Sequence, residues 1–231
     1  MGMDKHDNAT ESVLTNVFPG TRMEWEVIGL RRFLQLIMIL CFVTGISLTG
    51  YSLFQIGKGT YYVEKRRAEA RQIIQKGENA ENPESIDYSS ISYKKGETIG
   101  LLSIPKLDRD LPIIEGVDEE ELEMGVGHYT GTGYPLQNDQ IILSGHRDTV
   151  FRNFNRLEIG DTFIVKMNYG SFEYEIFDTE IVPADDTTVV GKYAGEEILT
   201  VTTCYPFSYI GNAPDRFIFY AKPLFETSHA N

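Results

Sequence analysis

A chain of 231 residues, with 42% hydrophobic and 24% charged side chains, is long enough for one globular domain with short accessory segments. The formal net charge of −13 lies entirely after Lys58, because positive and negative residues cancel from residue 1 up to and including Lys58. An acidic domain without a basic stripe argues against nucleic acid as a partner and against attachment to anionic lipid through bulk charge.

The first predicted element is a membrane-spanning helix. Residues 1–32 are expected to form a cytoplasmic tail, whereas residues 33–57 contain no charged side chain. At about 1.5 Å per residue, this run is long enough to cross a hydrocarbon core of about 30 Å. A cleaved signal peptide is the alternative, but the run is longer than a signal-peptide core and no clean cleavage site follows it. We therefore predict an uncleaved, single-pass anchor.

The local charge count opposes the orientation that we predict for this helix. The positive-inside rule places the side with more cations in the cytoplasm, and more of them follow the helix than precede it. Long domains translocate largely regardless of charge, however, and acids interleave the downstream cations. With the cysteine chemistry below, we predict a cytoplasmic N-terminus and an extracellular domain at the cell membrane. The cations before the helix are Arg22, Arg31 and Arg32, and those after it are Lys58, Lys65, Arg66, Arg67, Arg71 and Lys76.

Residues 58–95 are expected to connect the helix to the domain. The stretch from Tyr61 to Lys76 is rich in helix-favouring residues and is followed by Gly77, which is a plausible helix stop. It is predicted to extend the membrane helix as a stalk. From Glu78 to Lys95, Asn, Glu and Ser with one proline are typical of a linker.

Residues 96–231 are predicted to form an all-β domain, because short apolar runs alternate with Gly, Pro and Asp turns and aromatic residues are frequent. Asp118 and Glu121 resemble a capping box that opens a short helix ending at Met124. A closed barrel is preferred over a sandwich. The strand candidates are Thr98–Ile104, Leu111–Ile114, Gln140–Ser144, Thr162–Met167, Phe172–Val182, Ile198–Thr203 and Phe217–Ala221, with a hairpin turn at Asn168–Ser171.

The two cysteines have different settings. Cys41 lies inside the apolar run, so Cys204 is alone in the domain and a disulfide framework is impossible. Cys204, His146 and Arg216 each stand at the end of a predicted strand. Cysteine acyl transfer needs a thiolate, a proton donor and an oxyanion donor, which these residue types supply. From composition alone, an inert core thiol remains the commoner interpretation of Cys204.

Three segments resemble the signature motifs of the sortase family. Thr200-Val-Thr-Thr-Cys204 is similar to the family's T-L-x-T-C sequence, with Val201 in place of Leu as the one departure. Ser144-Gly-His-Arg147 is similar to its histidine motif, and Pro214-Asp-Arg-Phe217 to its arginine segment, in the family's order. The sequences that continue from the first two motifs resemble class D sortases in particular. The similarity runs from about Gly96 to Phe225.

The resemblance implies an eight-stranded sortase barrel with short helices, preceded by the transmembrane helix. It implies that Cys204 attacks a Leu-Pro-x-Thr-type sorting signal of a surface protein and forms a thioester after Thr. His146 would then be the acid and base, and Arg216 the oxyanion stabiliser. An amine of a peptidoglycan precursor would accept the chain, and lipid would contact only the N-terminal helix. No cofactor is expected.

Several alternatives remain open. The domain could be a non-catalytic barrel that binds wall peptides, or a cysteine peptidase that uses water as the acceptor. His128 is expected to pack in the core or a turn, and Asp148 to serve a turn or the surface rather than to orient His146. The loops 182–195 and 205–215 are expected to wall the substrate groove. Calcium is considered for four loop acids, for which solvation is the commoner role: Asp185, Asp186, Glu196 and Glu197.

Overall fold

The computed structural model describes residues 20–78, 87–208 and 211–224. The chain divides into two compact units, residues 1–55 and 56–231, which are described separately. The helices are α1 (Gly20–Glu78) and α2 (Glu119–Met124), with 3-10 turns η2 (Tyr88–Ser90), η3 (Pro105–Leu107) and η4 (Phe154–Arg156). The strands are β1 (Thr98–Ile104), β2 (Arg109–Glu115), β3 (Val126–His128), β4 (Ile141–Gly145), β5 (Thr162–Met167), β6 (Gly170–Pro183), β7 (Leu199–Tyr205) and β8 (Asp215–Pro223).

The described part of the first unit is helix α1, which contains the whole apolar run 33–57 and continues into the second unit. Its most apolar stretch has a mean hydropathy of 2.0, and no part of that stretch is buried by other protein. Among the described residues, α1 is the one helix that is long and apolar enough to cross a membrane. The predicted apolar helix ahead of the barrel is confirmed, whereas much of the predicted tail lies outside the described residues.

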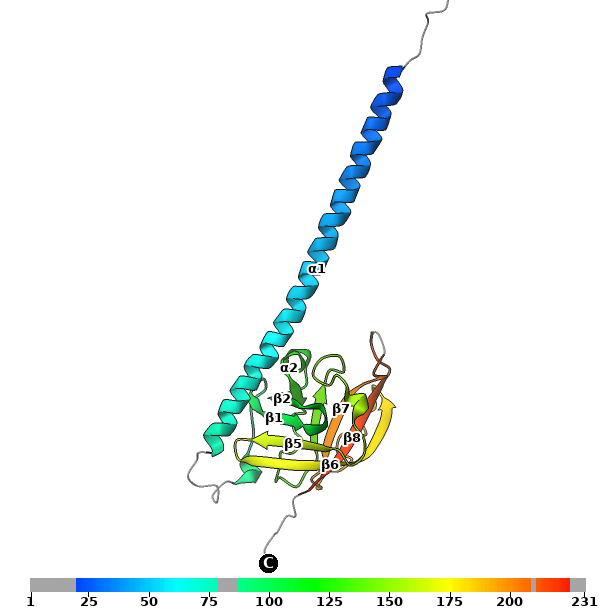
Figure 1. Ribbon diagram of the computed structural model, residues 1–231. Coiled ribbons are helices and arrows are strands. Elements are labelled where there is room, and N and C mark those ends of the chain that lie inside the picture. The colour runs from blue at the N-terminus through cyan, green and yellow to red at the C-terminus, as the bar shows by residue number, and fades with distance from the viewer. Residues whose placement is uncertain (1–19, 79–86, 209–210, 225–231) are drawn as a thin grey trace, which may run out of the picture. The chain divides into compact units, whose positions relative to one another are not determined.

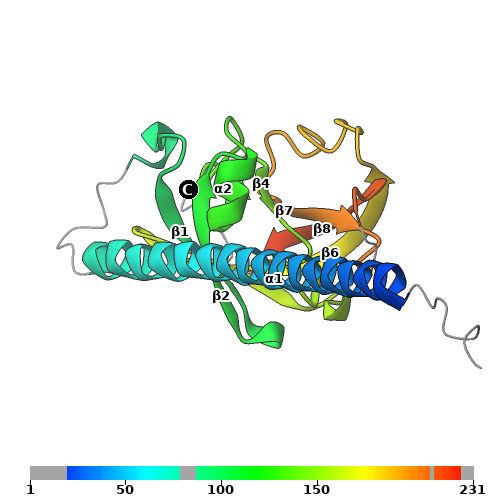
Figure 2. The ribbon, with the colours of Figure 1, turned by 90° about the horizontal axis from the view of Figure 1, so that it is seen from above.

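The second unit is a closed eight-stranded barrel with the strand order β1-β2-β3-β4-β7-β8-β6-β5 (Figure 1). The pairs β2–β3 and β4–β7 are parallel, and the other neighbours are antiparallel. Closure pairs β1 with β5, although β6 continues beyond its partner β5 and is paired there with β8 alone. The predicted all-β barrel is confirmed, and β7 lies between β4 and β8 (Figure 2).

Aromatic side chains fill the barrel, as the composition predicts. In β5 the burial alternates along the strand, which places Phe163 inside. Its ring lies 6.1 Å from that of Phe219 in an edge-to-face arrangement, and Phe154 lies 5.9 Å from Phe219 in the same arrangement. Phe154 and Phe151, both fully buried, come from the loop after β4 and are stacked at 4.0 Å. This loop is therefore anchored in the core directly after the predicted catalytic histidine.

The end of α1 is a packed element of the second unit. Ala70 and Ile74 are buried against Leu101 of β1. Arg66 donates a hydrogen bond from Nη1 to Thr98 Oγ1 at 3.1 Å, and Thr98 in turn donates to Glu69. The sequence predicts a stalk here, and the structure adds that one face of this helix covers strand β1. A helix whose apolar stripe is narrow still gains stability when that stripe is buried.

Candidate functional site

Strand register brings the three predicted site residues to one rim of the barrel. Cys204 on β7 lies directly opposite Arg216 on β8. Gly145, the last residue of β4, pairs with Thr203 on the other side of β7, so His146 follows next to Cys204. Directly opposed residues of an antiparallel pair have Cβ atoms about 5 Å apart on one face of the sheet. The fold therefore brings Cys204, His146 and Arg216 to neighbouring positions at the ends of the adjacent strands β7, β4 and β8.

A side-chain hydrogen bond joins the strands just below this triad. Thr203 donates from Oγ1 to the carbonyl oxygen of Gly145 at 2.9 Å, and the bond is buried. Gly145 has no room for a side chain, because an added Cβ would come within 2.6 Å of the Phe151 ring. The residues that precede Cys204 and His146 are thus held together by backbone pairing and by this bond. Rigid strand ends suit groups that must keep an exact mutual geometry.

The Arg216 guanidinium is turned toward its own loop. Nη1 donates to the carbonyl oxygens of Asp215, at 3.0 Å, and Ala213, at 3.4 Å. No carboxylate of the described residues lies within ion-pair distance of Arg216, so the Asp215 carboxylate is not a salt-bridge partner. Both contacts use one nitrogen, which leaves N–H donors on Nε and Nη2 without a partner among the described residues.

Arg147 and Asp148, which follow His146, are paired with each other. Arg147 is 7% exposed and donates to the Asp148 carboxylate from Nε and Nη2, each at 3.2 Å. Asp148 is 74% exposed at its side chain. The structure records its carboxylate with Arg147 rather than with His146. The sequence analysis gives Arg147 no role of its own. The position of Arg147 directly after His146 is the signal that points to it.

Three aromatic rings gather beside Cys204. The ring centroids of Tyr205 and Phe217 lie 5.7 Å apart, those of Phe207 and Phe217 5.2 Å, and those of Tyr205 and Phe207 5.6 Å. All three side chains are half-buried, and Phe207 and Phe217 pack against the core of the barrel. This aromatic cluster comes from the loop 205–215, which the sequence predicts to wall the groove, and from β8. Residues 209–210 of that loop lie outside the described residues.

Comparison with known proteins identifies the family of this chain. Residues 102–224 match the sortase domain family model. The chain belongs to the sortase family. Over 193 residues it is 41% identical to Sortase D of Bacillus subtilis, and the match covers 81% of this chain and 98% of that relative. Sortases are cysteine transpeptidases, so the protein is an enzyme of acyl transfer.

Solved structures place the barrel in the same family. A Clostridium perfringens Sortase D5 transpeptidase has a TM-score of 0.60 and 27% identity, covering 71% of this chain and 99% of that one. The catalytic domain of B. anthracis SrtD is 42% identical with a TM-score of 0.50, covering 61% and 97%. The resemblance to class D sortases in particular is confirmed.

Two of the four loop acids considered for calcium in this sortase, Asp186 and Glu197, accept hydrogen bonds from neighbouring residues. Glu197 accepts hydrogen bonds from Tyr174 Oη at 2.8 Å and from the Leu136 amide at 3.1 Å. Asp186 accepts from the amide and hydroxyl of Thr188. Over the described residues, no three His, Cys, Asp or Glu side chains gather in a way that could hold a metal ion. These two acids therefore brace loops around the barrel.

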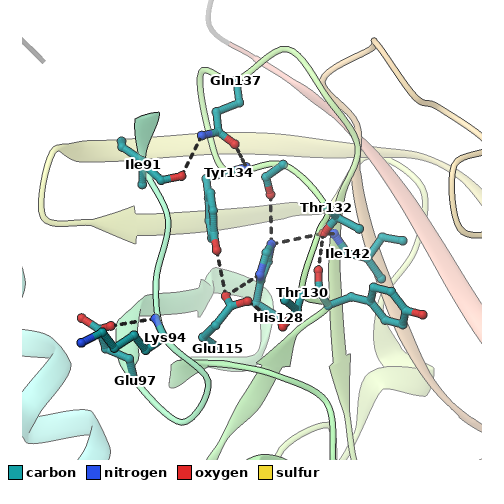
Figure 3. Close-up of polar contacts among 12 residues, drawn as sticks. Ile91, Lys94, Glu97, Glu115, His128, Thr130, Thr132, Tyr134, Gln137 and Ile142 are labelled. Atoms are coloured by element: carbon teal, nitrogen blue, oxygen red, sulfur yellow. Dashed lines mark hydrogen bonds and ion pairs between the residues drawn. The ribbon is translucent and has the colours of Figure 1, made fainter. Parts of the chain in front are cut away.

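His128 lies in a buried polar network with Glu115 and Tyr134, as Figure 3 shows. His128 and Glu115 are each 1% exposed, and His128 Nδ1 lies 2.7 Å from Glu115 Oε2. Tyr134 and Thr130 donate their hydroxyls to the two carboxylate oxygens at 3.0 and 2.8 Å. Burial by itself raises the pKa of Glu115, but the hydrogen bonds from His128, Thr130 and Tyr134 outweigh it and hold this pKa below its usual range. The network joins β2 to β3 and to the loop after β3.

We expect Glu115→Gln to destabilise the barrel by about 3 kcal/mol at pH 7, because it removes one partner of a buried pair. A carboxyl whose native pKa is lowered stabilises the fold above its unfolded pKa, near 4.5, and loses this contribution as the pH falls toward the native value. The wild type should therefore lose more stability than Glu115→Gln between pH 6 and pH 3. Urea unfolding of the full chain in detergent, followed by near-UV circular dichroism, measures both. Exposed Glu120→Gln is the control, and equal acid sensitivity in wild type and Glu115→Gln would contradict the assignment.

Proposed function

We propose that this sortase is anchored in the cell membrane by α1 and that Cys204, His146 and Arg216 form its active site. Cys204 Sγ attacks the carbonyl carbon of Thr in a Leu-Pro-x-Thr-type sorting signal of a surface protein. The observation that carries this proposal is the strand register. Cys204 is paired with Arg216 on β8, and Thr203 is paired with Gly145 of β4, the residue before His146. An inert core thiol would not need a half-exposed position at the rim beside both groups.

The chemistry proceeds in two halves. The thiol proton passes to His146, the S–C bond forms, and the carbonyl oxygen becomes an oxyanion that the unpaired donors of Arg216 stabilise. His146 then gives its proton to the departing amine as the C–N bond breaks, leaving a thioester on Cys204. In the second half an amine of a peptidoglycan precursor attacks the thioester. His146 takes the proton from this amine, and the thiol is released.

The choice of a Leu-Pro-x-Thr-type sorting signal rests on membership of the sortase family.

Product analysis separates this function from the two alternatives. The full chain in detergent is incubated with Leu-Pro-x-Thr peptides that carry a carboxy-terminal extension, with and without glycinamide as the added amine. We expect cleavage after Thr and, with the amine, a new amide product at the expense of the hydrolysed peptide. Hydrolysis that the amine does not redirect would show a peptidase, and absence of any cleavage would show a non-catalytic barrel.

The orientation of the anchor has its own test. We expect that protease added to intact protoplasts digests the domain after Lys58, because this domain is proposed to lie outside the cell. An antibody to an epitope at each end of the chain reports which part is cut. Protection of the domain until the membrane is lysed would reverse the topology and agree with the charge count around the helix.

A further inference from the structure

We propose that Arg147 is a positioning residue for the acyl transfer, which fixes the His146 loop against the loop that follows Cys204. This inference rests on the proposed roles of Cys204 and His146. Arg147 is not proposed to contact the substrate. It holds together the two loops that follow the reacting residues.

The central observation is a hydrogen bond across the rim. Arg147 Nη1 donates to the carbonyl oxygen of Pro206 at 2.7 Å. Arg147 is the residue after His146, and Pro206 is two residues past Cys204. One buried side chain therefore joins the segments that leave the two catalytic positions. A hydrogen bond from a charged donor is stronger than a neutral one and fixes direction as well as distance.

Two hydrogen bonds join the segments on either side of Cys204 and His146. On the strand side, the Thr203 hydroxyl is bound to the carbonyl of Gly145 at 2.9 Å. On the loop side, the Arg147 guanidinium is bound to the carbonyl of Pro206. His146 stands between Gly145 and Arg147, and Cys204 stands between Thr203 and the turn at Pro206. The first bond lies within paired strands, whereas the second is the bond that ties the two loops beyond the strand ends.

Because the Arg147 side chain is buried, its guanidinium needs hydrogen-bond acceptors such as the Pro206 carbonyl. A charged group that is 93% removed from solvent costs free energy unless hydrogen bonds compensate it. Asp148 supplies part of the compensation, but its side chain is mostly in solvent, where an ion pair contributes little. An apolar side chain of similar length would fill the same space without that cost. An apolar side chain, however, could not donate the hydrogen bond to Pro206 that fixes the distance between the two loops.

Loss of this bond is therefore expected to affect turnover more than substrate binding. The thiol and the imidazole must be aligned for proton transfer, and a misplacement of about 1 Å can cost about 10²-fold in rate. Peptide affinity depends on contacts with the peptide itself, whereas the buried Arg147 guanidinium is bonded to Asp148 and Pro206. An interaction that acts on the reacting geometry lowers kcat and leaves KM nearly unchanged.

The test compares variants of the full chain in detergent, all in a Cys41→Ala background so that Cys204 is the single thiol. Arg147→Met keeps much of the apolar stem and loses the donors, and Arg147→Lys retains one charged donor. Asp148→Asn removes the ion pair but keeps the bond to Pro206, and Arg156→Met removes an exposed arginine of the same loop. Each variant is measured for kcat, KM, the alkylation rate of Cys204 by iodoacetamide, and thermal unfolding.

We expect Arg147→Met to lower kcat by about 10- to 100-fold with KM within about threefold, and to slow alkylation of Cys204. Arg147→Lys should recover part of kcat, whereas Asp148→Asn and Arg156→Met should stay within about threefold of the parent. Normal kcat and alkylation in folded Arg147→Met would overturn the inference, as would losses that follow unfolding alone. If Cys204 were not the nucleophile, Cys204→Ala would still cleave the peptide. This result distinguishes a failure of the proposed function from a failure of the Arg147 inference.

Discussion

Replacing Cys204 by Ala is expected to abolish both cleavage of a sorting peptide and its transfer to an amine. Removal of the nucleophile of a catalytic triad costs about 10⁶-fold in kcat, which places the variant at the limit of detection. The barrel should remain folded, because Cys204 is half-exposed at the rim and contributes little to the core. Turnover of labelled peptide and the thermal midpoint, measured on the same preparation, check both halves of the expectation.

Cys41→Ala is the matched control for this variant. Cys41 lies in the exposed apolar part of α1, in the unit that does not contain the barrel. Its removal should leave turnover unchanged in detergent. Cleavage of the peptide by Cys204→Ala at the parent's rate would show that another residue is the nucleophile.

Replacing Arg216 by Ala is expected to lower kcat by about 10²- to 10³-fold, which is the usual cost of losing one oxyanion donor. Arg216→Lys keeps the charge but not the planar fork of N–H groups, so it should recover only part of this loss. KM should change less than kcat, because the interaction is made mainly in the transition state. In the structure Arg216 donates only to backbone carbonyls of its own loop, so these variants break no ion pair with the described residues.

Lys222→Ala provides the control on the same strand. Lys222 is exposed on β8, at the other end from Arg216, and should be replaceable without effect on turnover. Near-normal turnover in both Arg216 variants would show that backbone amides hold the oxyanion instead. A loss of activity that merely follows a lowered thermal midpoint would assign Arg216 a structural role.

Much of the barrel could be predicted because its strands are short, regular and apolar. Thr98–Ile104 and Thr162–Met167 are strands with the predicted bounds, and the turn at Asn168–Ser171 joins β5 to β6. The other predicted strands lie within about two residues of the observed ones. In each case the apolar run is bounded by Gly, Pro or Asp, so the local signal and the tertiary structure agree.

The misses have physical reasons. β3 consists of only Val126–His128, and a three-residue strand in a glycine-rich segment has no periodicity to detect. The capping box at Asp118 does not form: Asp118 occupies the N-cap position of α2, but its side chain makes no capping bond and pairs with Lys95. Glu121 is buried instead of exposed. The local sequence predicted the short helix, but tertiary contacts determine the surroundings of the Asp118 and Glu121 side chains.

The candidate site was predictable in its parts and partly in its arrangement. The short loop between Cys204 and Arg216 predicts two neighbouring strands with both residues at one rim, as the register of β7 and β8 has it. The position of His146 depends on the parallel pairing of β4 with β7, which alternating patterns do not encode. The link from Arg147 to Pro206 joins residues 59 positions apart and has no sequence signature of its own. Long-range pairing of this kind becomes visible only in the folded barrel.

The most direct test of the account is to trap the acyl-enzyme. The full chain is mixed with a Leu-Pro-x-Thr peptide, quenched in acid during turnover, digested and analysed by mass spectrometry. The account predicts that the fragment containing Cys204 gains the mass of the peptide's acyl portion ending in Thr, and that hydroxylamine at neutral pH removes it, as expected of a thioester. An acyl group on any other side chain, with Cys204 unmodified, would contradict it.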